Sequence, residues 1–116
     1  MKEIFVVEDD DGIRELLEFL LSDRNYDVKT FPSVRSFESN LPAKTPDLFL
    51  LDMMLPDGNG LDLCKKLKQT QSTRNIPVVL MSAHAHLSQM ECADDFIAKP
   101  FDVDDLIAKI DRQLDK

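Results

Sequence analysis

The amino-acid sequence predicts a single α/β domain in which helices cover both faces of a parallel sheet. Apolar runs of strand length alternate along the chain with segments of helical periodicity, five times in all. Strands that alternate with helices form parallel sheets, because each helix packs back onto a face of the sheet. A length of 116 residues is enough for one domain and too little for two, so we expect residues 1–116 to form a single domain.

The first half of the chain contains three predicted strands and two predicted helices. Continuous apolar runs at 4–7 and 48–51 are typical of buried strands, whereas residues 26–31 alternate, as in a less buried edge strand. A complete amphipathic repeat predicts the first helix: Ile13, Leu16, Leu17, Leu20 and Leu21. A shorter repeat predicts the second: Val34, Phe37 and Leu41. We expect Asp10 or Asp11 to cap the first helix.

The second half completes the alternation. The third helix is predicted by Leu61, Cys64 and Leu67, and the last helix by Val103, Leu106, Ile107, Ile110 and Leu114, with Asp102 as its N-cap. Apolar runs at 76–81 and 96–98 predict the fourth and fifth strands, and residues 83–93 between them are weakly patterned. Five strands with an amphipathic second strand fit the flavodoxin-like doubly wound order 2-1-3-4-5.

Composition excludes several classes of function. The net charge of −8 argues against nucleic-acid binding and against binding to an anionic membrane, since both need a basic face. It suits a partner with a basic patch, or a divalent cation, although for most of these charges simple solubility is the preferred explanation. The two cysteines have no metal or redox spacing, so we expect a reducing, cytoplasmic location. Acids interrupt the N-terminus too soon for a signal peptide, and no apolar run reaches the roughly 18 residues of a membrane span.

Polar side chains follow four of the predicted strands at their carboxyl ends. Glu8 and Asp9 follow the first strand, Asp52 the third, Ser82 the fourth and Lys99 the fifth. These ends open on one crevice in a parallel sheet, where three carboxylates repel one another unless a cation is bound. Mg²⁺ prefers such oxygen ligands and leaves room for phosphate, and a carboxylate can act as a nucleophile toward phosphorus. The alternative is that Lys99 neutralises the acids as a structural ion pair.

The chain resembles a known family in four motifs, each of which follows a predicted strand. The motifs are Val7-Glu8-Asp9, then Leu51 to Pro56 with Gly60, then Met81-Ser82-Ala83, then Asp95 to Phe101. They are similar to those of the receiver domain of two-component response regulators, which the bacterial chemotaxis response regulator typifies. The resemblance extends from Glu3 to about Leu114 and implies the flavodoxin-like fold.

The resemblance also implies a role for each acidic residue. Asp52 matches the phosphoacceptor, which takes a phosphoryl group from the phosphohistidine of a sensor kinase or of a histidine phosphotransfer protein. Asp9 and Asp52 match Mg²⁺ ligands, together with the backbone carbonyl of Met54, and Glu8 matches the acid that acts through water. Lys99 matches the residue that contacts the phosphoryl group, and the Lys99–Pro100 bond matches a cis peptide.

Four further positions match residues of the switch and of the path of the hydrolytic water. Ser82 matches the switch hydroxyl and Phe96 the switch aromatic, although by pattern alone Phe96 is a core strand residue. Met54 and His84 match positions that tune the lifetime of the phosphoryl group. For His84, simple exposure to solvent is the alternative.

One segment departs from the family pattern. Lys99 follows Ser82 by seventeen positions, roughly five fewer than in the family, which is more than one helical turn. We therefore expect the fourth helix, in 83–93, to be shortened, irregular or absent. Cys92 also stands where the family has glycine. These differences concern the surface that most receivers use for output and dimerisation.

The most specific hypothesis is a phosphorylatable signalling switch that controls an output partner. We expect no enzymatic action on a separate substrate, only assistance with its own phosphorylation and dephosphorylation. The main alternative is a receiver-like adaptor that does not use phosphorylation. A phosphatase with an aspartyl nucleophile requires a second Asp where this chain has Met54, and a flavin-binding protein fits the fold but not the acidic crevice.

Overall fold

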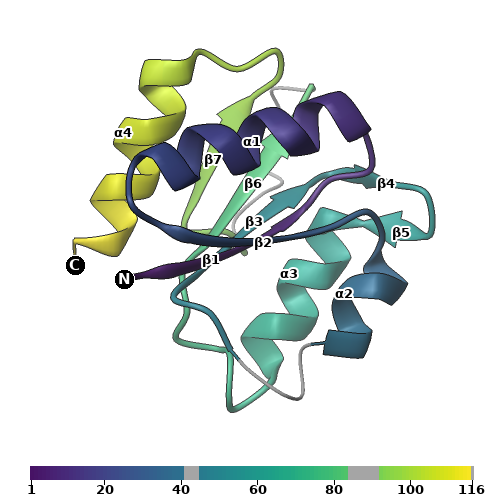
Figure 1. The fold of residues 1–116 in the computed structure, drawn as a ribbon. Coiled ribbons are helices and arrows are strands. Elements are labelled where there is room, and N and C mark those ends of the chain that lie inside the picture. Colours follow the sequence, from purple (N-terminus) through teal and green to yellow (C-terminus); the bar gives the residue numbers. More distant parts are fainter. Residues whose placement is uncertain (41–44, 84–91, 116) are drawn as a thin grey trace.

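A computed structural model of the protein describes residues 1–40, 45–83 and 92–115. Five parallel strands form the main sheet: β1 (Glu3–Val7), β2 (Asp27–Phe31), β3 (Leu48–Asp52), β6 (Val78–Ser82) and β7 (Asp95–Ala98). They lie in the order β2-β1-β3-β6-β7, and every neighbouring pair is parallel. In chain order of the five sheet strands this is 2-1-3-4-5, so the predicted doubly wound topology is confirmed (Figure 1).

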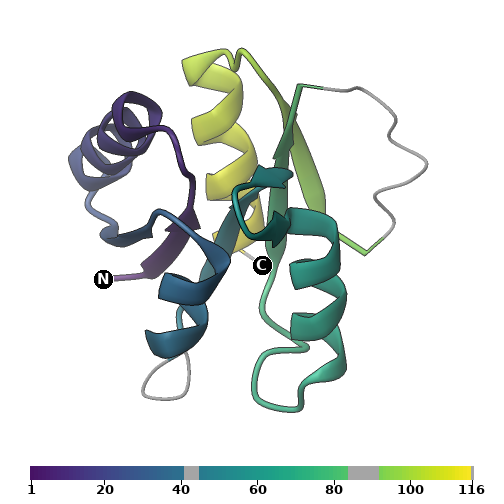
Figure 2. The same cartoon turned by 90° about the vertical axis from the view of Figure 1, so that its right-hand side faces the viewer.

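Helices cover both faces of the sheet. The described residues form α1 (Asp11–Asp23), α2 (Val34–Asn40), α3 (Gly60–Gln69) and α4 (Val103–Leu114). Figures 1 and 2 show α1 and α4 on one side of the sheet and α2 and α3 on the other. The domain therefore has three layers, and both faces of each inner strand are buried.

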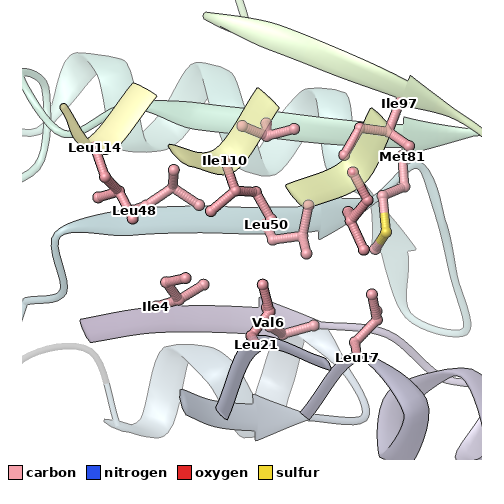
Figure 3. Packing of buried hydrophobic residues seen from close by; sticks show 12 residues of the cluster. Ile4, Val6, Leu17, Leu21, Leu48, Leu50, Met81, Ile97, Ile110 and Leu114 are labelled. Carbon is pink, nitrogen blue, oxygen red and sulfur yellow. The ribbon is translucent and has the colours of Figure 1, made fainter. Parts of the chain in front are cut away.

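Alternate residues of each strand point into two separate cores. Ile4, Val6, Leu48 and Leu50 pack under α1 and α4 with Leu17 and Leu21 (Figure 3). The intervening residues face α2 and α3, where four phenylalanine rings meet edge to face: Phe5, Phe31, Phe37 and Phe49. Leu63, Cys64 and Leu67 complete this second core, and Phe96 packs against it. Continuous apolar runs such as 48–51 are needed because each face has its own core.

Helix capping follows the predictions from sequence. The Asp10 side chain accepts a hydrogen bond from the Ile13 amide at 2.9 Å and begins α1, and Asp102 accepts from Asp105 at 3.0 Å and begins α4. The edge position of β2 is also confirmed. No helix in the described ranges is long and apolar enough to span a bilayer.

Three details differ from what the sequence indicates or lie outside the described residues. Leu16 and Val103, both in predicted amphipathic repeats, are 43% and 42% exposed and line a surface depression beside Lys99. The loop after Asp52 contains a short antiparallel hairpin, β4 (Met54–Leu55) and β5 (Gly58–Asn59). The predicted shortening of the fourth helix falls almost entirely on 84–91, outside the described residues.

Candidate functional site

Strand register brings the predicted site residues to one edge of the sheet. Val7 is paired with Leu51, so the next residues on these neighbouring strands are Glu8 and Asp52. On the other side of β3, Asp52 is paired with Met81. Ser82 is paired with Ala98, so Lys99 follows at the same end of β7. The convergence that the sequence predicts is therefore present.

Lys99 bridges the two most buried carboxylates of this edge. Its Nζ atom lies 2.8 Å from Glu8 Oε1 and 3.2 Å from Asp52 Oδ2. The Glu8 side chain is fully buried, and that of Asp52 is 6% exposed. Burial disfavours the charged ammonium, but hydrogen bonding to Glu8 and the charges of Asp52 and Glu8 outweigh it, so the pKa of Lys99 is raised. Lys99 therefore stays protonated between the two acids.

Glu8, Asp9 and Asp52 form a group of carboxylates with the composition of a metal site. One oxygen from each lies within 4.8 Å of the others, with Glu8 and Asp52 buried and Asp9 exposed. Three carboxylates and the single Lys99 ammonium give this cluster a formal charge of −2. Hard oxygen donors with excess negative charge and one side open to solvent fit Mg²⁺, which needs few protein ligands and keeps several waters.

The loop that carries Glu8 and Asp9 is held by a residue that the sequence analysis did not single out. Arg14 Nη1, on α1, donates to the backbone carbonyl oxygens of Glu8 at 3.1 Å and Asp9 at 3.3 Å. The Asp10 amide also donates to Glu8 Oε2, at 3.1 Å. These contacts fix the path of the backbone immediately after β1. A contact between a side chain and carbonyl oxygens five and six positions earlier has no periodic signature in the sequence.

The segment after Asp52 folds back onto this residue. The Met53 amide donates to Met81 O at 2.8 Å, and the Gly60 amide donates to Met53 O at 2.9 Å. The Met54 amide lies 3.4 Å from Asp52 Oδ1, while the Met54 side chain is 67% exposed. The β4–β5 hairpin thus begins and ends beside Asp52.

The predicted switch residues lie on the last two strands. Ser82 is buried at the end of β6. Phe96, on β7, is half-buried, and Lys109 Nζ lies 5.1 Å from the centre of its ring. The Lys99–Pro100 bond is cis, as the resemblance implies. His84 lies outside the described residues.

Comparison with known proteins decides the family. A family model for the response regulator receiver domain matches residues 4–111. The chain belongs to this family. The response regulator ArlR of Staphylococcus aureus is 36% identical over 115 residues, which are 95% of this chain and 51% of ArlR. The chain thus spans about half the length of the curated relatives that it matches.

Solved structures agree with the family assignment. The signal receiver domain of a signal transduction histidine kinase from Syntrophus aciditrophicus superposes with a TM-score of 0.91 at 32% identity, over 99% of this chain and 91% of that one. The response regulator TrrA of Thermotoga maritima, solved with Mg²⁺-BeF, superposes with a TM-score of 0.88 at 27% identity, over 98% of this chain and 100% of that one. Membership of the receiver family places this chain in phosphorelay signalling by two-component systems.

Proposed function

We propose that this receiver accepts a phosphoryl group on Asp52 from the phosphohistidine of a sensor kinase or histidine phosphotransfer protein, with Mg²⁺ bound at the acidic cluster. The observation that supports this most strongly is the pairing of Lys99 with Asp52 beside Glu8 and Asp9. A buried carboxylate, a fixed ammonium and a surplus of negative charge are the components that aspartyl phosphorylation requires.

The residues of the chain divide the chemistry between them. An Asp52 carboxylate oxygen attacks phosphorus as the bond from phosphorus to the imidazole nitrogen of the donor breaks. The electron pair of that bond stays on the nitrogen, and a proton carried by the other ring nitrogen makes the released histidine neutral. The Lys99 ammonium, 3.2 Å from Asp52 Oδ2, stabilises the negative charge of the transferred group. Ser82, at the end of the neighbouring strand, offers a hydroxyl to a phosphoryl oxygen. We infer that Asp9, Asp52 and the Met54 carbonyl hold Mg²⁺, with Glu8 acting through water.

Bound Mg²⁺ would neutralise the charge of the phosphoryl oxygens and of the carboxylates around them. Two observations support this assignment. The carboxylate oxygens lie within 4.8 Å of one another, which suits a shared cation. The relative TrrA, whose fold this chain shares over nearly its whole length, was solved with Mg²⁺-BeF.

Phosphorylation would then shift an equilibrium between two conformations that differ at Ser82 and Phe96. This shift would control an output partner in the cytoplasm. The chain acts on no separate substrate in this proposal and promotes only its own phosphorylation and dephosphorylation. Met54 and His84 are the positions expected to tune the lifetime of the phosphoryl group.

The direct test is intact mass spectrometry after incubation with acetyl phosphate and Mg²⁺. We expect the mass of one phosphoryl group on the wild-type chain, and none on Asp52→Asn or without Mg²⁺. A reaction with a phosphorylated kinase domain tests the natural donor. Should neither donor modify the wild-type chain, and should Mg²⁺ give no protection against heat, the alternative of a phosphorylation-independent adaptor would be favoured.

A further inference from the structure

The exposed carboxylate of Asp57 joins the hairpin after Asp52 to the start of α2. Asp57 Oδ1 accepts a hydrogen bond from the Val34 amide, and Oδ2 accepts one from the Arg35 amide, both at 2.9 Å. The two partners lie 23 and 22 positions earlier in the chain. These bonds therefore link two separate elements and are not a local turn.

Asp57 completes the capping of α2. The first four amides of a helix have no partner within the helix. In α2 the Ser36 amide donates to Ser33 Oγ at 3.1 Å, and the regular helical bonds begin with the Phe37 amide, which donates to Ser33 O at 3.1 Å. The first two, from Val34 and Arg35, donate to Asp57. The start of this seven-residue helix thus depends on a carboxylate from another part of the chain.

The hairpin depends equally on contacts from outside. Strands of two residues each have little stability of their own, so their position is set by their anchors. At the base the anchors are the hydrogen bonds of Met53 and Gly60. At the tip they are Asp57 and the close approach of Gly58 to Val34, where an added Cβ would lie 3.2 Å from Val34 Cγ2. Between base and tip lies Met54, whose carbonyl is a ligand in the proposed function.

We propose that Asp57 is a positioning residue that couples occupancy of the cation site to the start of α2. The inference depends on the proposed function, because it takes the Met54 carbonyl as a ligand of the cation. A cation bound there restrains the hairpin, and the restrained hairpin holds Asp57 on the amides of α2. Coupling between two sites is reciprocal. Loss of the Asp57 cap therefore weakens binding of the cation by the factor by which the bound cation stabilises the cap.

The test measures the α2 amides directly. Hydrogen exchange of the Val34 and Arg35 amides is followed by NMR while MgCl₂ is added. In the wild type we expect exchange at these two amides to slow several-fold at saturation. In Asp57→Ala we expect faster exchange without Mg²⁺ and no further effect of the ion. Asp23→Ala, which removes an exposed carboxylate at the end of α1, controls for the change in net charge.

Calorimetric titration with MgCl₂ supplies the second measurement. We expect Asp57→Ala to bind Mg²⁺ roughly three- to tenfold more weakly than the wild type. This loss is at or below the lower end of the losses in metal affinity that follow when residues supporting metal ligands are replaced. Asp57→Asn carries no charge but keeps one oxygen acceptor, so it is expected to lie between the wild type and Asp57→Ala. Equal losses in Asn and Ala would mean that charge alone acts, and this would overturn the positioning role.

The result also separates this inference from the proposed function. If the wild type binds Mg²⁺ and is phosphorylated but exchange at Val34 and Arg35 is unchanged, the coupling is overturned and the proposed function stands. If the wild type neither binds Mg²⁺ nor accepts a phosphoryl group, the proposed function fails and the coupling fails with it. If MgCl₂ slows exchange at both amides in the wild type but not in Asp57→Ala, the coupling and the cation site of the proposed function are both supported.

Discussion

Gly60 lies so close to Asp52 that no side chain fits between them. A Cβ atom on Gly60 would lie 2.4 Å from the Asp52 carbonyl oxygen and 3.0 Å from its carbonyl carbon. The contact is with backbone, so rotation of a side chain cannot relieve it. Glycine is therefore required at position 60 for a steric reason: the first residue of α3 packs directly on the backbone of Asp52.

Gly60→Ala is accordingly expected to displace α3 or Asp52 and to lower the free energy of unfolding by about 1–3 kcal/mol, as overpacking in a core does. Urea denaturation measures the loss. Gly12→Ala is the matched control, because its Cβ would make only an ordinary contact at 3.4 Å with Asp10 Oδ1. In the first turns of α1 we expect this control to be neutral or to stabilise by up to about 1 kcal/mol. Similar losses in both variants would contradict the steric explanation.

Replacement of Lys99 by Met should destabilise the protein in a way that Mg²⁺ relieves. The change leaves the buried Glu8 and Asp52 side by side without the ammonium that bridges them. Removal of one partner from such a buried group costs about 3–5 kcal/mol. Urea denaturation with and without MgCl₂ is expected to show the loss and its partial recovery, since a bound cation replaces the missing charge.

Lys68→Met is the control for Lys99→Met. Like Lys99, Lys68 forms an ion pair, with Asp94 at 2.7 Å. It makes a second hydrogen bond, to the backbone carbonyl of Ile76. It lies in α3 and contacts none of the three clustered acids through these bonds. We expect this variant to lose stability without any recovery in MgCl₂. An equal effect of Mg²⁺ on both variants would argue against a cation among Glu8, Asp9 and Asp52.

The sequence predicts the strands, the topology and the convergence of the acids because these features have local or periodic signals. The runs at 4–7 and 48–51 and the cap at Asp102 are examples, and the structure confirms them. Arg14 and Asp57 could not be predicted in this way. Each binds backbone atoms of another segment, and such contacts depend on the packed arrangement rather than on residue spacing. The exposure of Leu16 has the same origin, because the width of the buried stripe depends on what packs against it.

Arg14→Lys should weaken Mg²⁺ binding at the acidic cluster although it keeps the positive charge of the side chain. The guanidinium donates from Nη1 to the Glu8 and Asp9 carbonyls and, at the same time, from Nη2 to the Asp11 carboxylate. The ammonium of lysine carries its donors on one nitrogen and lacks the rigid plane that holds these directions together. We expect roughly three- to tenfold weaker Mg²⁺ binding by calorimetry. Arg14→Ala should lose less affinity than this at low salt, because removal of a positive charge near the site favours the cation. Affinity in Arg14→Lys equal to that of the wild type would show that the loop keeps its position without this contact.

The single tyrosine provides a test of the packing between α1 and α4. The Tyr26 hydroxyl donates to Asp111 Oδ1, and Arg24 Nη2 binds Asp111 Oδ2 at 2.7 Å. Burial, followed by the hydrogen bond to Asp111 and the charge of that residue, raises the pKa of Tyr26 well above its ordinary value near 10. The neutral phenol is thus favoured in the folded protein.

A folded-state pKa above the unfolded value fixes the sign of the pH dependence. The contribution of Tyr26 to stability is complete below about pH 10, the unfolded pKa, and falls as the pH rises toward the folded pKa. The near-ultraviolet absorbance of tyrosinate reports this residue alone, since the chain has one Tyr and no Trp. We expect the wild type to ionise later than an unfolded sample, and Asp111→Ala, which removes the acceptor and its charge, to ionise at lower pH than the wild type. Identical titrations of wild type and Asp111→Ala would mean that the hydroxyl does not bind Asp111 in solution.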